Sequence, residues 1–182
     1  MFKLILAREI VLVFVLFLSV IFDLRVRRIP NWLTVPGVVA GLLLNGLEGF
    51  AQFLHSFLGL MVGVGVLIVP FALGWLGAGD VKLFGMVGAV LGVQWIPRVL
   101  FYSGVMSGML AVFVVIMRGV NLKAFPRMWM DLKLFVMSLG QVLPDGISQR
   151  TSHKKSIPWA VAIGLGVVVA FYLDADGKWA GF

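Results

Sequence analysis

The sequence predicts an all-α, polytopic membrane protein with about six transmembrane helices and a cytoplasmic amphipathic segment between the fifth and sixth. Three observations support this fold class. Hydrophobic residues make up 61% of the 182 residues and charged residues only 13%, against about 25% charged residues in typical soluble domains. Several apolar runs approach the length of about 20 residues that a helix needs to cross a bilayer. The chain also has 22 glycines, and small residues let membrane helices pack closely.

The six predicted spans follow the apolar runs in chain order. Their expected bounds are 4–22, 32–47, 53–73, 80–95, 99–117 and 157–173. Asn31 precedes the second span and has the side chain of a typical helix N-cap. Pro70 is expected to bend or end the third span. The fourth span begins at or just after Asp80, and Ile96 with Pro97 is expected to close it.

A polar segment, residues 118–156, separates the fifth and sixth predicted spans. Its apolar residues recur at helical spacing, at Met128, Leu132, Phe135, Val136 and Leu139. This pattern predicts an amphipathic helix on the membrane surface. A loop helix packed against the bundle explains the pattern equally well.

The distribution of positive charge predicts the orientation of the chain in the membrane. Eleven lysines and arginines fall on one predicted side and four on the other, and the richer side is normally cytoplasmic. Both chain ends are then expected outside. Because the basic residues flank apolar runs, the net charge of +7 reflects topology and predicts no nucleic-acid partner. The cytoplasmic set is Arg25, Arg27, Arg28, Lys82, Arg118, Lys123, Arg127, Lys133, Arg150, Lys154 and Lys155.

Two acidic residues, Asp23 and Asp80, lie at the predicted cytoplasmic ends of spanning helices. An acid at this depth is costly and is often functional. Two carboxylates that lie close together share one proton, so one can activate a water while the other donates to a carbonyl oxygen. This is aspartic-peptidase chemistry, which requires no metal. Two structural interpretations remain open, because Asp23 can pair with Arg27 one helical turn later and Asp80 can cap the fourth helix.

Other catalytic classes receive little support from the composition. The chain has no cysteine, which excludes disulfides, iron–sulfur clusters and thiolate-bound zinc. The two histidines, His55 and His153, fall on opposite predicted sides of the membrane, so no shared metal site is expected. We therefore expect neither a metal nor another cofactor.

Three segments resemble motifs of the type IV prepilin peptidase family, whose members are GxGD membrane aspartic peptidases. Residues 23–31, DLRVRRIPN, are similar to its D-x-x-x-x-x-I-P-N segment, and residues 77–83, GAGDVKL, match its G-x-G-D-x-K-L motif. Residues 154–164, KKSIPWAVAIG, resemble the basic and proline-containing entry to its last helix. The three segments occur in the family order and extend over most of the chain.

The resemblance implies an inner-membrane aspartic endopeptidase that removes the short basic leader from prepilins or pseudopilins on the cytoplasmic side, after a glycine. Prepilin leaders and membrane lipid would be its partners. By motif position, Asp23 and Asp80 are the catalytic pair. The supporting motif residues are Gly77, Gly79, Lys82, Pro30 and Asn31.

The chain departs from the larger family members in one respect. Those members carry a cysteine-rich cytoplasmic domain between the first two spans, whereas about nine residues and no cysteine separate the spans here. We therefore expect a single membrane-embedded domain, residues 1–182, similar to compact members that serve Flp-type (tight-adherence) pili or to preflagellin peptidases. A small ion-coupled transporter and a non-catalytic pilus assembly factor are the alternative functions.

Overall fold

The structure, a computed structural model, describes residues 2–73, 75–118 and 159–173. Within these ranges the chain is helical and contains no β-strand. The elements are α1 (Phe2–Val26), α2 (Asn31–Gly46), α3 (Phe50–Ala72), α4 (Ala78–Leu91), the short 3₁₀ helix η1 (Val93–Trp95), α5 (Ile96–Arg118) and α7 (Trp159–Leu173). The all-α prediction is confirmed over these ranges, whereas the predicted amphipathic segment at 118–156 lies almost entirely outside them.

The chain is a multi-pass membrane protein. Three of its described segments are long and apolar enough to cross a membrane, namely Lys3–Val26, Phe50–Ala72 and Val93–Val114. The shorter helices α2, α4 and α7 coincide with three further predicted spans. At 14 residues, α4 is about 21 Å long, less than the roughly 30 Å of a hydrocarbon core. The count of six spans therefore stays a prediction.

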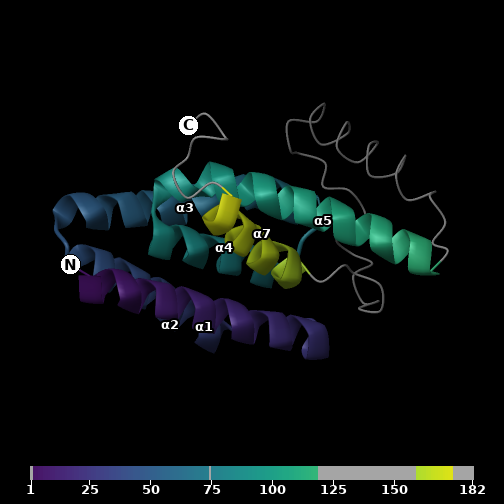
Figure 1. The fold of residues 1–182 in the computed structure, drawn as a ribbon, viewed down its shortest axis with the longest axis horizontal. Helices are drawn as coiled ribbons and strands as arrows, with labels where there is room; N and C mark the ends of the chain where they lie inside the picture. Colours follow the sequence, from purple (N-terminus) through teal and green to yellow (C-terminus); the bar gives the residue numbers. More distant parts are fainter. Residues whose placement is uncertain (1, 74, 119–158, 174–182) are drawn as a thin grey trace.

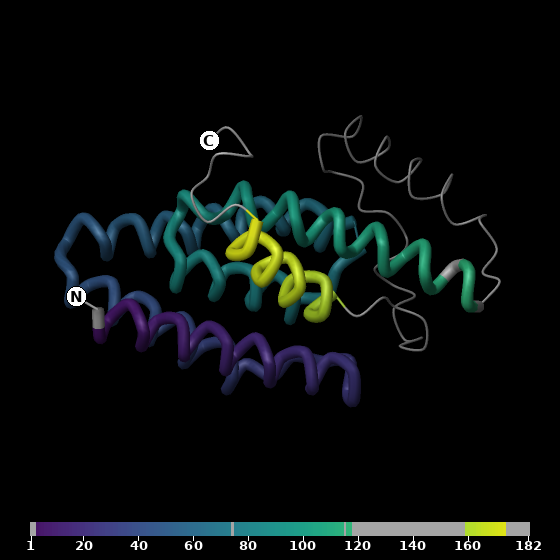
Figure 2. Tube along the Cα trace, viewed as in Figure 1, coloured from purple at the N-terminus to yellow at the C-terminus, as the bar shows by residue number. Residues whose placement is uncertain are grey.

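Helix α4 is the centre of the bundle. It packs most extensively against α3 and α2 and also contacts α1 and α7. Figure 1 shows α1 along one side of the bundle and α5 along the other, with α4 and α7 between them, and Figure 2 traces the same arrangement as a tube. Every residue of α4 from Leu83 to Val90 is buried. This burial agrees with the apolar character of the helix on all sides.

Glycines allow the neighbouring helices to approach the α4 backbone. A Cβ atom added at Gly59 of α3 would overlap the carbonyl group of Gly88 of α4, and one added at Gly88 would overlap the carbonyl of Gly59. On the other side, a Cβ at Gly41 of α2 would lie 2.9 Å from the carbonyl oxygen of Ala89. Gly59 and Gly63 in α3, like Gly37 and Gly41 in α2, have the small-xxx-small spacing that brings membrane helices into contact.

Polar side chains surround the C-terminal end of α4. The Asn45 amide nitrogen lies 3.3 Å from the carbonyl oxygen of Ala89 and 3.2 Å from that of Val90. Ser56 donates to the Ala89 carbonyl as well, and Arg8 donates to the Asn45 side-chain oxygen. These bonds satisfy carbonyl groups that a helix end leaves without intrahelical partners. We call Arg8, Asn45 and Ser56 the polar cluster.

The junction between the fourth and fifth helices differs from its prediction. Ile96 and Pro97 begin α5 rather than close the preceding helix. Helix α4 ends earlier, at Leu91, because Gly92 adopts a φ of +88° that favours glycine, and η1 then connects the two helices. Proline is well tolerated in the first turn of a helix, where its missing N–H has no partner to lose. Pro70 lies inside α3, which continues to Ala72, so it does not itself end the helix.

We expect Gly59→Ala to destabilise the protein, because the added methyl group must push α3 away from the α4 backbone. Overpacking of this kind costs about 1–3 kcal/mol. The matched control is Gly65→Ala in the same helix, where a Cβ meets nothing within 4 Å and the substitution removes backbone entropy from the unfolded chain. The free energy of unfolding in mixed micelles, followed by tryptophan fluorescence, measures both. Equal stability of the two variants would contradict the close contact.

Candidate active site

Asp23 lies in the last turn of α1 and is half-buried. Its Oδ2 atom accepts a hydrogen bond of 3.1 Å from the backbone N–H of Ala160, the second residue of α7. The N–H groups of a first helical turn have no intrahelical acceptor, and the helix dipole favours a negative charge there. Asp23 therefore joins α1 to the start of the last described helix. Arg27 also interacts electrostatically with the Asp23 carboxylate.

Asp80 is the third residue of α4 and is 8% exposed. Its Oδ2 atom accepts a hydrogen bond of 3.0 Å from the backbone N–H of Gly77, which is the N-cap residue of the helix. The carboxylate thus satisfies a backbone donor just before its own helix and lies at the positive end of the helix dipole. Asp80 is therefore not the N-cap residue itself, as the structural interpretation had it, but it stabilises the start of α4 from the third position.

The two predicted motif segments contact each other directly. The Nζ atom of Lys82 donates a hydrogen bond of 2.8 Å to Oδ1 of Asn31. One turn earlier, a Cβ atom added at Gly79 would lie 3.0 Å from the Cβ of Ile29, which is itself buried. The start of α4 therefore packs on the connection between α1 and α2, and a side chain at position 79 would separate them.

The prediction that Asn31 caps α2 is wrong. Pro30 is the N-cap residue, with φ −73° and ψ 144°, and no side chain caps the helix. Asn31 is instead the first residue inside α2, and its side-chain oxygen accepts the hydrogen bond from Lys82. The Asn31 side chain, which the local sequence pattern predicts to cap the helix, instead bonds to Lys82, 51 residues away in the sequence.

These contacts bring all the predicted site residues to one end of the bundle. Asp23 is linked to the start of α7, Ile29 to the start of α4, and Asn31 to Lys82. Gly77 precedes Asp80 and is exposed, so a peptide can approach the start of α4 without meeting a side chain at that position. Among the described residues, no group of three His, Cys, Asp or Glu side chains could hold a metal ion.

Two contributors to the site were not predicted as site residues. Ala160 acts through its backbone N–H and Ile29 through its contact with Gly79. The available signal for Ala160 was the proline-containing entry to the last helix, since the first residues after such an entry carry unpaired N–H groups. The signal for Ile29 was its place beside Pro30 in the first motif segment.

Comparison with known proteins identifies the family. The sequence profile of the type IV leader peptidase family matches residues 10–112. The chain belongs to the type IV leader peptidase family. The matched range contains both Asp23 and Asp80 and ends before α7.

Individual relatives agree with this assignment. The chain is 32% identical over 120 residues to a prepilin leader peptidase/N-methyltransferase of Aeromonas hydrophila, an alignment that covers 60% of this chain and 40% of the relative. It is 36% identical over 97 residues to a protein of the same description from Escherichia coli (strain K12), covering 50% and 43% of the two chains. The chain thus spans about two fifths of the length of the curated relatives it matches. No solved structure matches it significantly.

The hydrogen bond between Lys82 and Asn31 predicts a measurable coupling between the two motif segments. We expect Lys82→Met and Asn31→Ala to be non-additive in a double-mutant cycle, with a coupling of about 0.5 kcal/mol because the bond is exposed. Unfolding in mixed micelles supplies the three free-energy differences. The control cycle pairs Asn31→Ala with Arg25→Met, which changes an exposed residue of α1 and should be additive. Additivity in both cycles would show that the bond does not tie α2 to α4.

Proposed function

We propose that this protein is a membrane aspartic endopeptidase that removes the basic leader peptide from prepilins or pseudopilins, cutting after a glycine. Asp23 and Asp80 are the catalytic pair in this proposal. It rests above all on one observation: two acids from different helices lie at the same end of the bundle, and each is oriented by a backbone N–H. The family assignment supports the same reaction class, and the prepilin substrate comes from the description of its relatives.

In the proposed reaction, the two carboxylates share one proton. The ionised carboxylate accepts a proton from a water molecule, which attacks the carbonyl carbon of the scissile peptide bond. The protonated carboxyl group donates its proton to the carbonyl oxygen, which gives a tetrahedral intermediate. The carboxyl group that took the water proton then gives it to the amide nitrogen, the C–N bond breaks to release the amine of the mature chain, and the hydroxyl proton of the intermediate returns to the other carboxylate. The hydrogen bonds from Gly77 and Ala160 hold the carboxylates in position throughout.

The remaining motif residues have supporting roles in this proposal. Lys82 and Asn31 hold the start of α4 against the start of α2, and Gly79 allows that contact. Pro30 sets the extended backbone that precedes α2. Gly77 leaves room for the substrate backbone beside Asp80. The arginines near Asp23 support an inner-membrane location with this end of the bundle in the cytoplasm and both chain ends outside.

We expect Asp23→Asn and Asp80→Asn each to lower the cleavage rate by at least about 10³-fold, because neither amide can transfer the shared proton. The amide oxygen can still accept the backbone hydrogen bond, so the fold should persist. Co-expression with a candidate prepilin, and mass-spectrometric mapping of the cut in purified membranes, measures the loss. The control Glu48→Gln changes an acid that is paired with Arg8 at the other end of the bundle and should retain activity within about twofold.

Full cleavage by either aspartate variant would remove that residue from the mechanism. Loss of cleavage in the Glu48→Gln control as well would point to a general folding defect. A wild-type protein that cuts no prepilin, while its aspartates are needed for ion flux in proteoliposomes, would replace the peptidase with a transporter.

A further inference from the structure

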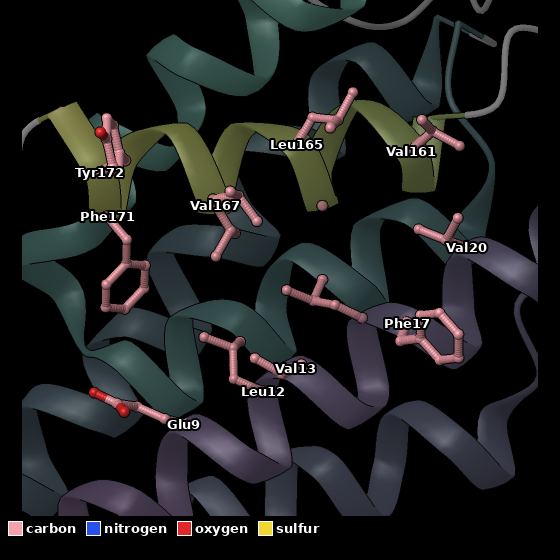
Figure 3. Close-up of a pocket in the computed structure, with 13 residues that line it drawn as sticks. Glu9, Leu12, Val13, Phe17, Val20, Val161, Leu165, Val167, Phe171 and Tyr172 are labelled. Atoms are coloured by element: carbon pink, nitrogen blue, oxygen red, sulfur yellow. The ribbon is translucent and has the colours of Figure 1, made fainter.

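An apolar groove runs between α1 and α7 on the lipid-facing side of the bundle. It has a volume of about 650 Å³, and its lining is apolar except for Glu9 and the hydroxyl group of Tyr172. Figure 3 shows Val167 and Phe171 of α7 extending toward α1 and Leu12 of α1 extending toward α7, with Leu165 at the outer edge of α7. The groove is a concave surface built by two helices that contact each other.

The groove has a buried floor and exposed rims. Leu12, Leu16 and Val167 form the floor and are at most 6% exposed. Val13 and Val168 lie on the rims and are 65% and 63% exposed. A side chain that entered from the membrane would therefore contact apolar atoms on three sides, whereas a lipid-facing helix surface offers contact on one side only.

The shape of the groove fits a helix. Its α1 wall presents residues 9, 13, 16 and 20, and its α7 wall presents residues 161, 165, 168 and 172. Each wall thus follows the three- and four-residue spacing of one helix face over about 16 Å, or three turns. Two adjacent ridges of this kind form the surface into which a third helix packs. Within a membrane, a peptide with unpaired backbone groups is excluded, so an incoming chain must itself be helical.

One end of the groove lies at the candidate active site. Val20 of the α1 wall comes three residues before Asp23, and Val161 of the α7 wall directly follows Ala160. Asp23 and Ala160 are the two residues joined by the hydrogen bond between these helices. A helix that occupies the groove would therefore end beside the Asp23 carboxylate.

We propose that this groove binds an apolar helical segment of the substrate, in the part of the chain retained after cleavage. This inference rests on the proposed peptidase function and adds a second recognition site to it. The embedded helix fills the groove for about three turns, and the chain that continues from its end carries the scissile bond to Asp23. The basic leader then lies beyond the bundle, in water. Substrate selection depends on an apolar helix as well as on the residues around the cut.

Groove-filling variants test this proposal. In vesicles, we expect Val13→Trp and Val168→Trp each to raise the KM for a prepilin that keeps its apolar segment by about tenfold, the loss expected when one buried aliphatic contact is removed. A short water-soluble peptide, with the leader and a few residues after the glycine, should be cut with unchanged kcat/KM. The control Val112→Trp lies on the exposed face of α5 and should change neither substrate. Equal losses for the two substrates, or no loss for the membrane-embedded one, would overturn the proposal.

A binding measurement separates failure of the groove from failure of the enzyme. Photo-reactive benzoylphenylalanine in place of Phe17, combined with Asp23→Asn, should cross-link to the membrane-embedded prepilin without turnover. The same group in place of Phe113, an exposed residue of α5, should not. Adducts with lipid alone, or with a second copy of the protein, would overturn the groove assignment. If the cross-link to the prepilin forms but the wild-type protein cleaves no prepilin, the groove assignment stands and the peptidase function is rejected.

Discussion

The close approach of backbones around α4 is the constraint on which the rest of the structure depends. Lipid chains are as apolar as leucine side chains, so membrane helices gain little from hydrophobic burial against each other and rely on packing. Gly59 against Gly88, and Gly41 against Ala89, provide that packing on two sides of α4. In the first turn of this enclosed helix, Ala78 is exposed and Asp80 is buried, so Asp80 is the residue that faces the interior of the bundle.

The two motifs, about fifty residues apart in the sequence, form one structural unit. Lys82 reaches Asn31, Gly79 packs on Ile29, and Asp23 accepts a hydrogen bond from the start of α7. Gly79, Lys82 and Asn31 therefore act together, because their contacts hold the start of α4 against residues 29–31. The acids differ from them because they already have backbone partners and bring titratable groups to the same place. The match to the family covers both acids, and a backbone N–H orients each of them at the same end of the bundle.

Elements with a local physical cause could be predicted from the sequence. The apolar runs place the helices, and the two acids stand out because charges are rare in such runs. Features that depend on distant partners could not be predicted. Asn31 is a residue type that often caps helices, but its side-chain oxygen accepts a hydrogen bond from Lys82 instead. Ile96 and Pro97 are compatible with the start of a helix as well as with its end. Because Gly92 already ends α4, they begin α5. The bond between Asp23 and Ala160 joins residues 137 positions apart, which no periodicity encodes.

The polar cluster at the far end of α4 has a consequence for the chemistry at the near end. Asn45 and Ser56 hold the carbonyl group of Ala89, nine residues after Asp80, or about 14 Å along the helix. If Asn45 and Ser56 bonded the carbonyl group of a neighbouring residue instead, Asp80 would shift by about 1.5 Å along the helix axis and turn by roughly 100° about it. The hydrogen bonds at the C-terminal end of α4 therefore help to fix the depth and direction of the Asp80 side chain at its N-terminal end.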